Sequence, residues 1–297
     1  MGGVCRESDY IRELGDGTVI VDRGPMLVSI SASNAGMPVS TCARQGAKKA
    51  LEVLETLATF RNVIVQKVSE IASVEALPPV VRKMVLAARK FGDPETTPLI
   101  AVAGAGADEV ADFIYNTGRV SKVLVNNGGD IAIRLRDHEI VKIGIKTDLT
   151  EKGITHIMTV TAKSGIRGVA TSGFGGRSFT KGIANAAVAV AADAISADVA
   201  ATLIGNATDV ESPCVTRALA KKLYPATDIP DLLVTTRVGH LERSEIEMAL
   251  DHGMRKAKIF EDNGLIIGVF LAVKDQIRIS PESIAQFIEP VSNIFAV

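Results

Sequence analysis

The segment that most constrains the fold of this 297-residue chain is 184–201, in which ten of eighteen residues are alanine. Alanine has the highest intrinsic helix propensity and a very small side chain. We therefore predict a helix over residues 185–205, packed closely against its neighbours. Elsewhere β-branched runs alternate with segments of helical spacing, such as the hairpin expected over 17–32 and the helix expected over 43–60. This mixture predicts an α+β fold.

The length of the chain allows one large domain or two smaller ones. The sequence shows no repeat and no low-complexity linker, and we predict a single domain over residues 1–297 with interleaved helices and strands. If the chain divides, a C-terminal subdomain would cover 210–297. In that part we expect helices over 215–223 and 243–254 and a strand over 231–238.

Charge and aromatic content exclude several classes of function. The 33 Lys and Arg residues are balanced by 34 Asp and Glu residues, so the formal net charge is −1. Nucleic-acid binders need excess positive charge and often aromatic stacking platforms, whereas this chain has no Trp, 3 Tyr and 9 Phe. We therefore expect no nucleic-acid partner.

Neither the apolar runs nor the cysteines indicate export or membrane insertion. We find no uncharged apolar run of roughly 20 residues and no secretory signal pattern, so we expect no membrane partner. The three cysteines are far apart, which fits a reduced cytoplasmic setting. The spacing of the polar residues assigns no role to Cys42 or His240.

The first candidate binding segment is Asn126-Asn127-Gly128-Gly129-Asp130, which follows an apolar run. The two glycines permit positive φ angles and a close approach of the backbone to a ligand. The Asn and Asp side chains would then present amide and carboxylate groups at a turn. A plain hairpin turn is the competing interpretation, because Asn-Gly is a very common tight-turn sequence.

The second candidate is the glycine-rich segment 165–182. Backbone N–H groups in such a segment can surround an anion, and Arg177 and Lys181 would add positive charge for a phosphate or carboxylate. Thr171 and Ser172 are candidate catalytic hydroxyls, as nucleophile or proton relay. The substrate-binding residues predicted here are Gly173, Arg177, Ser178 and Lys181. A surface loop without a ligand is the competing interpretation.

The third candidate is a pair of polar residues in the alanine-rich segment. Asp198 and Thr202 are four residues apart and share one face of a helix. A carboxylate and a hydroxyl are oxygen ligands of the kind that Mg²⁺ takes, with waters completing its coordination. Acids are seldom buried without a partner, and this helix is otherwise almost entirely apolar. We therefore predict Asp198 as a catalytic residue and Asp198 and Thr202 as metal ligands.

Four motifs, in this order, resemble the ApbE-like superfamily, whose founding branch is FAD:protein FMN transferase, and most closely its UPF0280 (DUF375-like) branch. The motifs are residues 101–108, 125–131, 168–173 and 196–206, and the likeness is best over 79–206. The resemblance implies an ApbE-like core of mixed sheets with packed helices. It also implies that Asp198 and Thr202 bind Mg²⁺, and that the Thr-Ser-Gly segment and the Asn-Gly-Gly turn line a pocket for FAD or FMN.

The chain departs from the transferases at two places. Ala103-Gly104 stands where they carry a Lys-Gly pair, and residues 178–182 stand where they carry a His-Ile-x-Asp-Pro-like stretch. We therefore predict a cytoplasmic enzyme that acts on a small anionic or ring-containing molecule, with one pocket formed by all three candidate segments. Three alternatives stay open: an Mg²⁺-dependent flavin transferase, a hydrolase or isomerase of a cyclic metabolite, and a non-catalytic flavin or small-ligand carrier. The small residues would also suit a tight homodimer.

Overall fold

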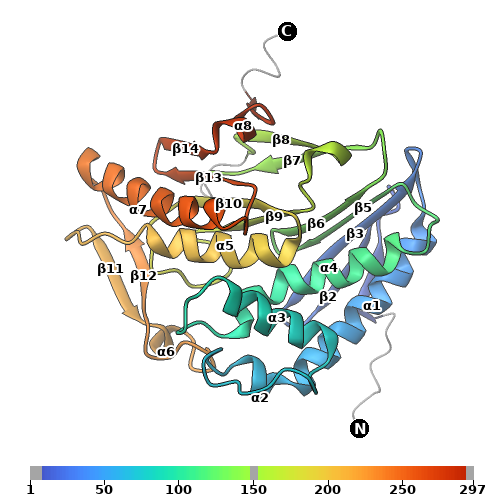
Figure 1. Cartoon of the computed structure of the whole chain (residues 1–297), viewed down its shortest axis with the longest axis horizontal. Helices are drawn as coiled ribbons and strands as arrows, with labels where there is room; N and C mark the ends of the chain where they lie inside the picture. The colour runs from blue at the N-terminus through green and yellow to red at the C-terminus, as the bar shows by residue number, and fades with distance from the viewer. Residues whose placement is uncertain (1–8, 148–152, 292–297) are drawn as a thin grey trace. The chain divides into compact units, whose positions relative to one another are not determined.

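The computed structural model describes residues 9–147 and 153–291 (Figure 1). The chain divides into two compact units, and each unit is made of three separate stretches of the sequence. Unit 1 consists of Met1–Glu139, Thr161–Val169 and Asp193–Ile195, and unit 2 of Ile140–Val160, Ala170–Ala192 and Ser196–Val297. The predicted mixture of helices and strands is confirmed, whereas the single domain stays a prediction.

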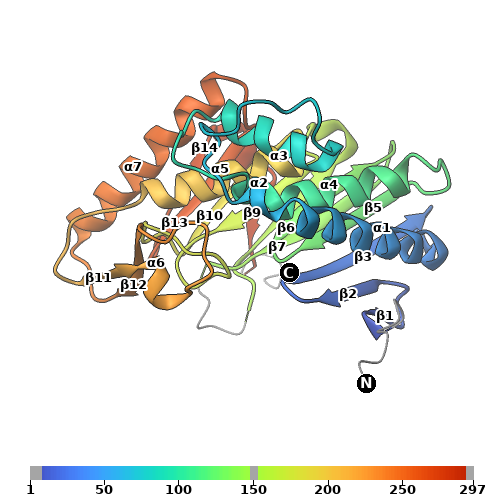
Figure 2. The same ribbon diagram turned by 90° about the horizontal axis from the view of Figure 1, so that it is seen from below.

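Unit 1 is built on an antiparallel sheet with strand order β1-β2-β3-β5-β6-β9, and β4 pairs with β3. The strands are β1 (Ile11–Glu13), β2 (Val19–Arg23), β3 (Met26–Asn34), β4 (Met37–Pro38), β5 (Lys122–Asn127), β6 (Asp130–Leu135) and β9 (Gly168–Ser172), whose first two residues belong to this unit. Helices α1 (Ser40–Thr59) and α4 (Val102–Tyr115) cover one face of the sheet (Figures 1 and 2).

The expected hairpin over residues 17–32 is confirmed as β2 and β3. Arg23 pairs with Met26 across the turn at Gly24-Pro25. Along β3, Met26, Val28, Ile30 and Ala32 are buried, while the residues between them are more exposed. This alternation points every second side chain of β3 toward the core, and it fixes the register of the strand.

The other helices described in unit 1 have 12 residues or fewer. They are α2 (Arg61–Ile64), α3 (Pro79–Lys90) and the 3₁₀ helices η2 (Pro98–Ala101) and η3 (Ala162–Ser164). Pro79 occupies the first position of α3, where its missing N–H costs no intrahelical hydrogen bond.

Unit 2 contains the strand order β9-β10-β13-β14 and two smaller sheets, β11-β12 and β15-β8-β7. Helix α7 packs on β13 and β14. The strands are β7 (Ile140–Ile145), β8 (His156–Thr161), β10 (Ala186–Ala191), β11 (Val215–Leu219), β12 (Leu233–Val238), β13 (Gly268–Val273), β14 (Gln276–Ser280) and β15 (Ile288–Pro290). The helices are α5 (Ala194–Ala207), α6 (Ala220–Leu223), α7 (Arg243–Asp262) and α8 (Glu282–Ala285).

The prediction of a helix over residues 185–205 is wrong in its first part, where β10 (Ala186–Ala191) is a strand. All six residues of β10 are fully buried, and the strand pairs antiparallel with β13, for example Val188 with Phe270. Small side chains fit a strand covered on both faces, so packing overrides the helix propensity of alanine. Only the second part forms a helix, α5. The helix expected over 215–223 is also wrong: β11 pairs antiparallel with β12, and α6 has only four residues.

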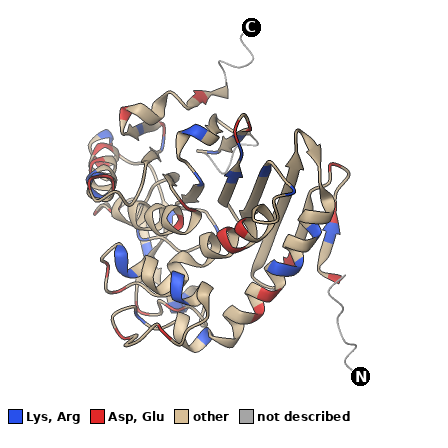
Figure 3. Ribbon diagram, turned by 45° about the vertical axis from the view of Figure 1, so that its right-hand side comes forward, with Lys and Arg blue, Asp and Glu red and all other residues tan. Residues whose placement is uncertain are grey.

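Charged residues of both signs lie along α1 and α7, while the strands carry few of them (Figure 3). This distribution leaves the strands apolar and places charge at helix surfaces, as in ordinary globular folds. In residues 9–147 and 153–291, no helix combines the length and apolarity that a membrane crossing requires.

Candidate functional site

The turn at residues 126–130 is the tight connection between β5 and β6 in unit 1. Asn127 pairs with Asp130, and Gly128 and Gly129 have φ angles of 72° and 117°. Two positive φ angles in succession are what a two-residue hairpin loop requires. Oδ1 of Asn126 accepts a hydrogen bond from the Gly129 N–H at 2.8 Å. The plain-turn interpretation therefore accounts for Asn126 and the two glycines.

Asn127 ties this turn to helix α4. Its Nδ2 donates to the carbonyl oxygen of Ala103 at 3.2 Å, and the side chains of Asn127 and Asp130 are half-buried. Ala103 is the residue that the sequence resemblance places at the lysine position of the transferases, and here its carbonyl oxygen accepts this bond. The remaining predicted site residues, Thr171 to Lys181, Asp198 and Thr202, lie in unit 2. A single pocket formed by all three segments therefore stays a prediction.

Thr171 and Ser172 end strand β9. Ser172 is buried, at 9% exposure, while Thr171 is exposed. The next residue, Gly173, has a φ of 154°, and a Cβ there would lie 2.7 Å from the carbonyl oxygen of Asn185. The N–H of Phe174 donates to the carbonyl oxygen of Ala184 at 2.7 Å. Glycine at 173 thus lets the chain run against residues 184–185, and this fixes one end of the glycine-rich segment.

The far end of that segment is fixed by hydrogen bonds to Asn206 on α5. Oδ1 of Asn206 accepts from the Thr180 hydroxyl at 3.1 Å and from the Lys181 N–H at 2.9 Å. The N–H of Thr235 donates to the carbonyl oxygen of Thr180 at 2.8 Å. Between the two fixed ends, Gly175, Gly176, Arg177 and Ser178 are exposed. Residues 175–178 therefore expose their backbone and the side chain of Arg177 to solvent, while hydrogen bonds hold the residues on either side of them.

Helix α5 and the segment 180–184 approach each other at backbone distance. A Cβ on Gly182 would lie 1.9 Å from the carbonyl oxygen of Gly205 and 2.4 Å from the Thr208 hydroxyl. That hydroxyl is fully used, because it accepts from the N–H groups of Ile183 and Ala184 at 3.0 Å and donates to Gly205 at 2.7 Å. No side chain fits at position 182.

Gly182→Ala is therefore expected to lower the free energy of unfolding by about 3 kcal/mol, since the methyl group must displace the carbonyl group of Gly205 and the hydroxyl of Thr208. Gly15→Ala is the matched control, because no atom lies within 4 Å of a Cβ built there. Urea unfolding of both variants measures the difference. Equal stabilities of the two variants would contradict the close approach at Gly182.

Asp198 and Thr202 lie one turn apart on α5, and Asp198 is 8% exposed. The predicted burial of an acid in an apolar helix is thus found. Over the described parts of the chain, no group of three or more His, Cys, Asp and Glu residues is arranged to hold a metal. The donors at this face are one carboxylate and one hydroxyl. This set fits Mg²⁺, which commonly takes one or two carboxylates and completes its shell with water and substrate phosphates.

Unit 1 contains a charge cluster, centred on the buried Arg134 and Asp108, that no motif in the sequence predicted. Arg134, at 3% exposure, donates from Nε to Asp112 at 2.6 Å and from an Nη to Asp108 at 2.8 Å. Asp108, at 6% exposure, accepts from the N–H of Ile195 through its other oxygen at 2.9 Å. Burial raises the pKa of Asp108, and Arg134 opposes that rise. The signal in the sequence is an acid within a Gly/Ala-rich helix and an arginine within an apolar strand.

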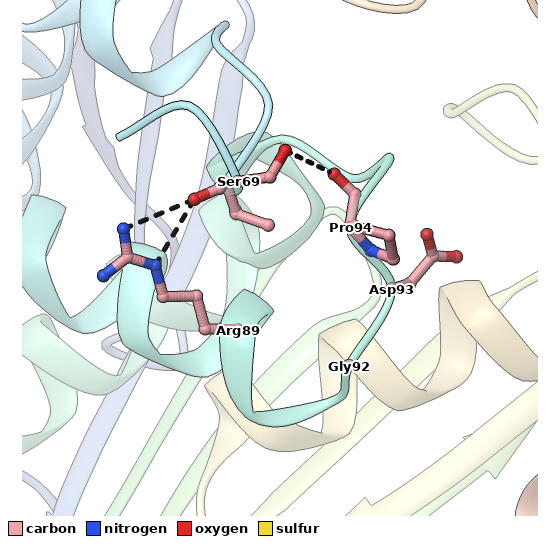
Figure 4. A pocket seen from close by; sticks show the side chains of 6 residues that line it. Ser69, Arg89, Gly92, Asp93 and Pro94 are labelled. Carbon is pink, nitrogen blue, oxygen red and sulfur yellow. Dashed lines mark hydrogen bonds between the residues drawn. The ribbon is translucent and has the colours of Figure 1, made fainter. Parts of the chain in front are cut away.

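Among the described residues of unit 1, two surface hollows can be named whose linings contain no predicted site residue. One, of about 270 Å³, is lined by Val68, Ser69, Arg89, Gly92, Asp93 and Pro94 (Figure 4). Arg89 bonds the carbonyl oxygens of Val68 and Ile71, so its guanidinium holds the neighbouring loop. The other, of about 220 Å³, is lined by Tyr115, Ile133, Arg134, Leu135, Thr161, Ala162, Ile166 and Arg167.

The family model described as AbpE bacteria matches residues 11–279, and the chain belongs to this family. A UPF0280 protein of Methanopyrus kandleri is 36% identical over 152 residues, which cover 50% of this chain and 58% of that protein. A UPF0280 protein of Methanococcoides burtonii is 39% identical over 135 residues, covering 45% and 54%. The matches thus span little more than half the length of these relatives.

Among solved structures, the apo form of the flavinyl transferase ApbE from Pseudomonas stutzeri is similar in fold. The TM-score is 0.50 at 13% sequence identity, and the alignment covers 92% of this chain and 97% of that chain. The predicted ApbE-like fold and the likeness to UPF0280 proteins are confirmed.

Proposed function

We propose that the protein is an Mg²⁺-dependent flavin transferase that uses FAD. The observation that carries the proposal is the family match over residues 11–279. The fold of the Pseudomonas stutzeri flavinyl transferase supports it. FAD also meets the broader expectation from the sequence, because it is a small molecule with both an anionic diphosphate and a ring system.

Asp198 and Thr202 would hold the metal ion in this proposal. Their oxygens provide only two ligands, so the ion would take the others from water and from the diphosphate of FAD. Bound Mg²⁺ supplies stabilisation of negative charge on phosphate oxygens during transfer. Binding of metal and binding of FAD should therefore depend on each other.

The glycine-rich segment would bind the rest of FAD. Arg177 is exposed between the two fixed ends and can approach a phosphate. The backbone N–H of Lys181 already donates to Asn206, so its contribution is its ammonium group. Thr171, Ser172 and Gly173 would lie beside the flavin. The proposed transfer forms a bond from an acceptor hydroxyl oxygen to the phosphorus of the FMN half, and the bond to AMP breaks. The acceptor proton goes to solvent, and AMP leaves with the bonding electrons.

A flavin carrier without transfer is the second candidate. The observation that favours it is Ala103, where the transferases carry a lysine and where this chain uses only a backbone carbonyl, bonded to Asn127. The release of AMP from FAD, with water as the acceptor, separates the two functions. A transferase releases AMP and FMN in equal amounts when Mg²⁺ is present and not in EDTA. Tight FAD binding without AMP in either condition would support the carrier and contradict transfer.

A cytoplasmic location and a homodimer also remain proposals. The homodimer proposal is supported by the small residues concentrated in α4, β10 and α5, because small side chains allow close packing between two surfaces. Light scattering on the purified protein measures the mass in solution directly.

A further inference from the structure

The first turn of α5 is capped by a residue from a distant part of the chain. The first N–H groups of a helix have no intrahelical acceptor and are usually satisfied by the residue just before the helix. Here the N–H of Ile195, the second residue of α5, donates to Oδ2 of Asp108 at 2.9 Å, across 87 positions of sequence. A carboxylate at this place also interacts favourably with the helix dipole.

Both oxygens of Asp108 are held. Oδ1 accepts from Arg134 at 2.8 Å, and Oδ2 accepts from Ile195. Arg134 is fixed in turn by Asp112 at 2.6 Å and by the carbonyl oxygen of Ile133 at 3.1 Å. The position of the carboxylate is therefore held by the buried Arg134 on β6, which the half-buried Asp112 on α4 fixes in turn, and the carboxylate accepts from the first turn of α5.

Asp198 follows Ile195 by three residues, which is less than one turn of the helix. Helix ends fray unless their terminal groups are satisfied, and fraying would move the carboxylate of Asp198. Residues that orient a metal ligand without touching the metal change metal affinity substantially when they are replaced.

We infer that Asp108 is a positioning residue for the metal-binding face of α5. Its carboxylate fixes the first turn and, through that turn, the side chain of Asp198. This inference rests on the proposed function, because it takes Asp198 as a ligand of Mg²⁺.

The test compares variants by the Mg²⁺ concentration that half-saturates FAD binding, measured by flavin fluorescence. Asp108→Ala removes the bond to Ile195, and the half-saturating Mg²⁺ concentration is expected to rise about tenfold. Asp108→Asn keeps one oxygen that can accept from the same N–H, while its amide nitrogen replaces the oxygen that accepts from Arg134, so its value should lie between those of the wild type and Asp108→Ala. Asp112→Asn weakens the hold on Arg134 without touching α5 and is the matched control, with an unchanged value.

A second variant guards against misfolding of Asp108→Ala. Asp108→Ala with Arg134→Met removes the unpaired guanidinium together with the carboxylate, and such replacements of a whole buried pair are tolerated. The same rise of about tenfold is expected in this pair of substitutions. Amide hydrogen exchange at Ile195 and Asp198 should also become faster in both alanine variants and not in Asp112→Asn.

The two proposals fail in different ways. If the wild-type protein binds FAD with no dependence on Mg²⁺, the proposed function is overturned, and this inference falls with it. If the wild type depends on Mg²⁺ and the alanine variants keep its half-saturating concentration and its exchange rates, only the positioning role is overturned. A rise of equal size in Asp112→Asn would also overturn it, since general loosening of the cluster would then be the cause.

Discussion

Asp198→Ala is expected to abolish Mg²⁺-dependent binding of FAD, with a loss of affinity on the order of a hundredfold or more. Asp198 is the only charged residue of α5, so its carboxylate would be the one charged metal ligand from this helix. Thr202 would supply a neutral hydroxyl ligand. Alanine is the best helix former and already occurs five times in α5, so the fold should be retained. The variant thus separates binding from stability.

The measurement is a titration of FAD into wild type and variant, each with Mg²⁺ and with EDTA, accompanied by thermal unfolding. Asp193→Asn is the matched control, because it removes a carboxylate from the residue just before α5 and leaves a good capping side chain. Wild-type affinity in Asp198→Ala would contradict the assignment of this residue. An equal loss in Asp193→Asn would also contradict it, because any nearby charge would then suffice.

Arg134→Leu is expected to lower the free energy of unfolding by about 3–5 kcal/mol, because it leaves Asp108 buried without its cation. The melting temperature should fall by about 10 °C. Asp112 loses its shorter ion pair too, but it is more exposed, can be solvated and keeps Arg167 at 3.9 Å. The large loss of stability in Arg134→Leu is therefore expected to come from the carboxyl group of Asp108, which is buried away from water.

The loss in Arg134→Leu should depend on pH. Burial raises the pKa of Asp108, and without Arg134 that effect is less opposed. The folded variant then holds a proton at pH values where the unfolded chain has released it, so stability falls as pH rises above the ordinary range for Asp, about 3.9. The deficit relative to wild type is therefore smaller at about pH 5 than at about pH 8.

Urea unfolding at both pH values measures these differences, with Arg167→Leu as the control. Arg167 is 55% exposed in its side chain and reaches Asp112 only at 3.9 Å, so its removal should cost less than about 1 kcal/mol. Equal losses in the two variants, or a loss independent of pH, would show that the pairing of Arg134 with Asp108 does not control stability.

Turn residues and apolar spacing in the sequence were sufficient to predict one hairpin and one long helix. The turn Gly24-Pro25 between two β-branched runs predicted the β2–β3 hairpin, and the apolar spacing predicted α1. Residues 186–191 were assigned to a helix because of their alanine content, and residues 215–219 because their pattern is that of an amphipathic helix. Pairing with β13 and β12 decides their structure, and no local pattern encodes those partners.

The candidate site divides in the same way. Asp198 could be predicted as buried because it interrupts an apolar helix, and the structure places it there. Asn126 was assigned to binding, although its side chain supports the turn through Gly129. Asp108 satisfies the criterion that identified Asp198, an acid among small apolar residues. Its partners Arg134 and Ile195 are distant in sequence, so only the structure shows what it does.

The most direct test of the proposed function is the affinity of the wild-type protein for FAD, measured with Mg²⁺ and with EDTA. The proposed site, with one carboxylate and one hydroxyl, predicts that Mg²⁺ tightens FAD binding at least about tenfold and that FMN, which lacks the diphosphate, shows a smaller gain. Equal FAD affinities in the two conditions, or no saturable binding in either, would contradict it.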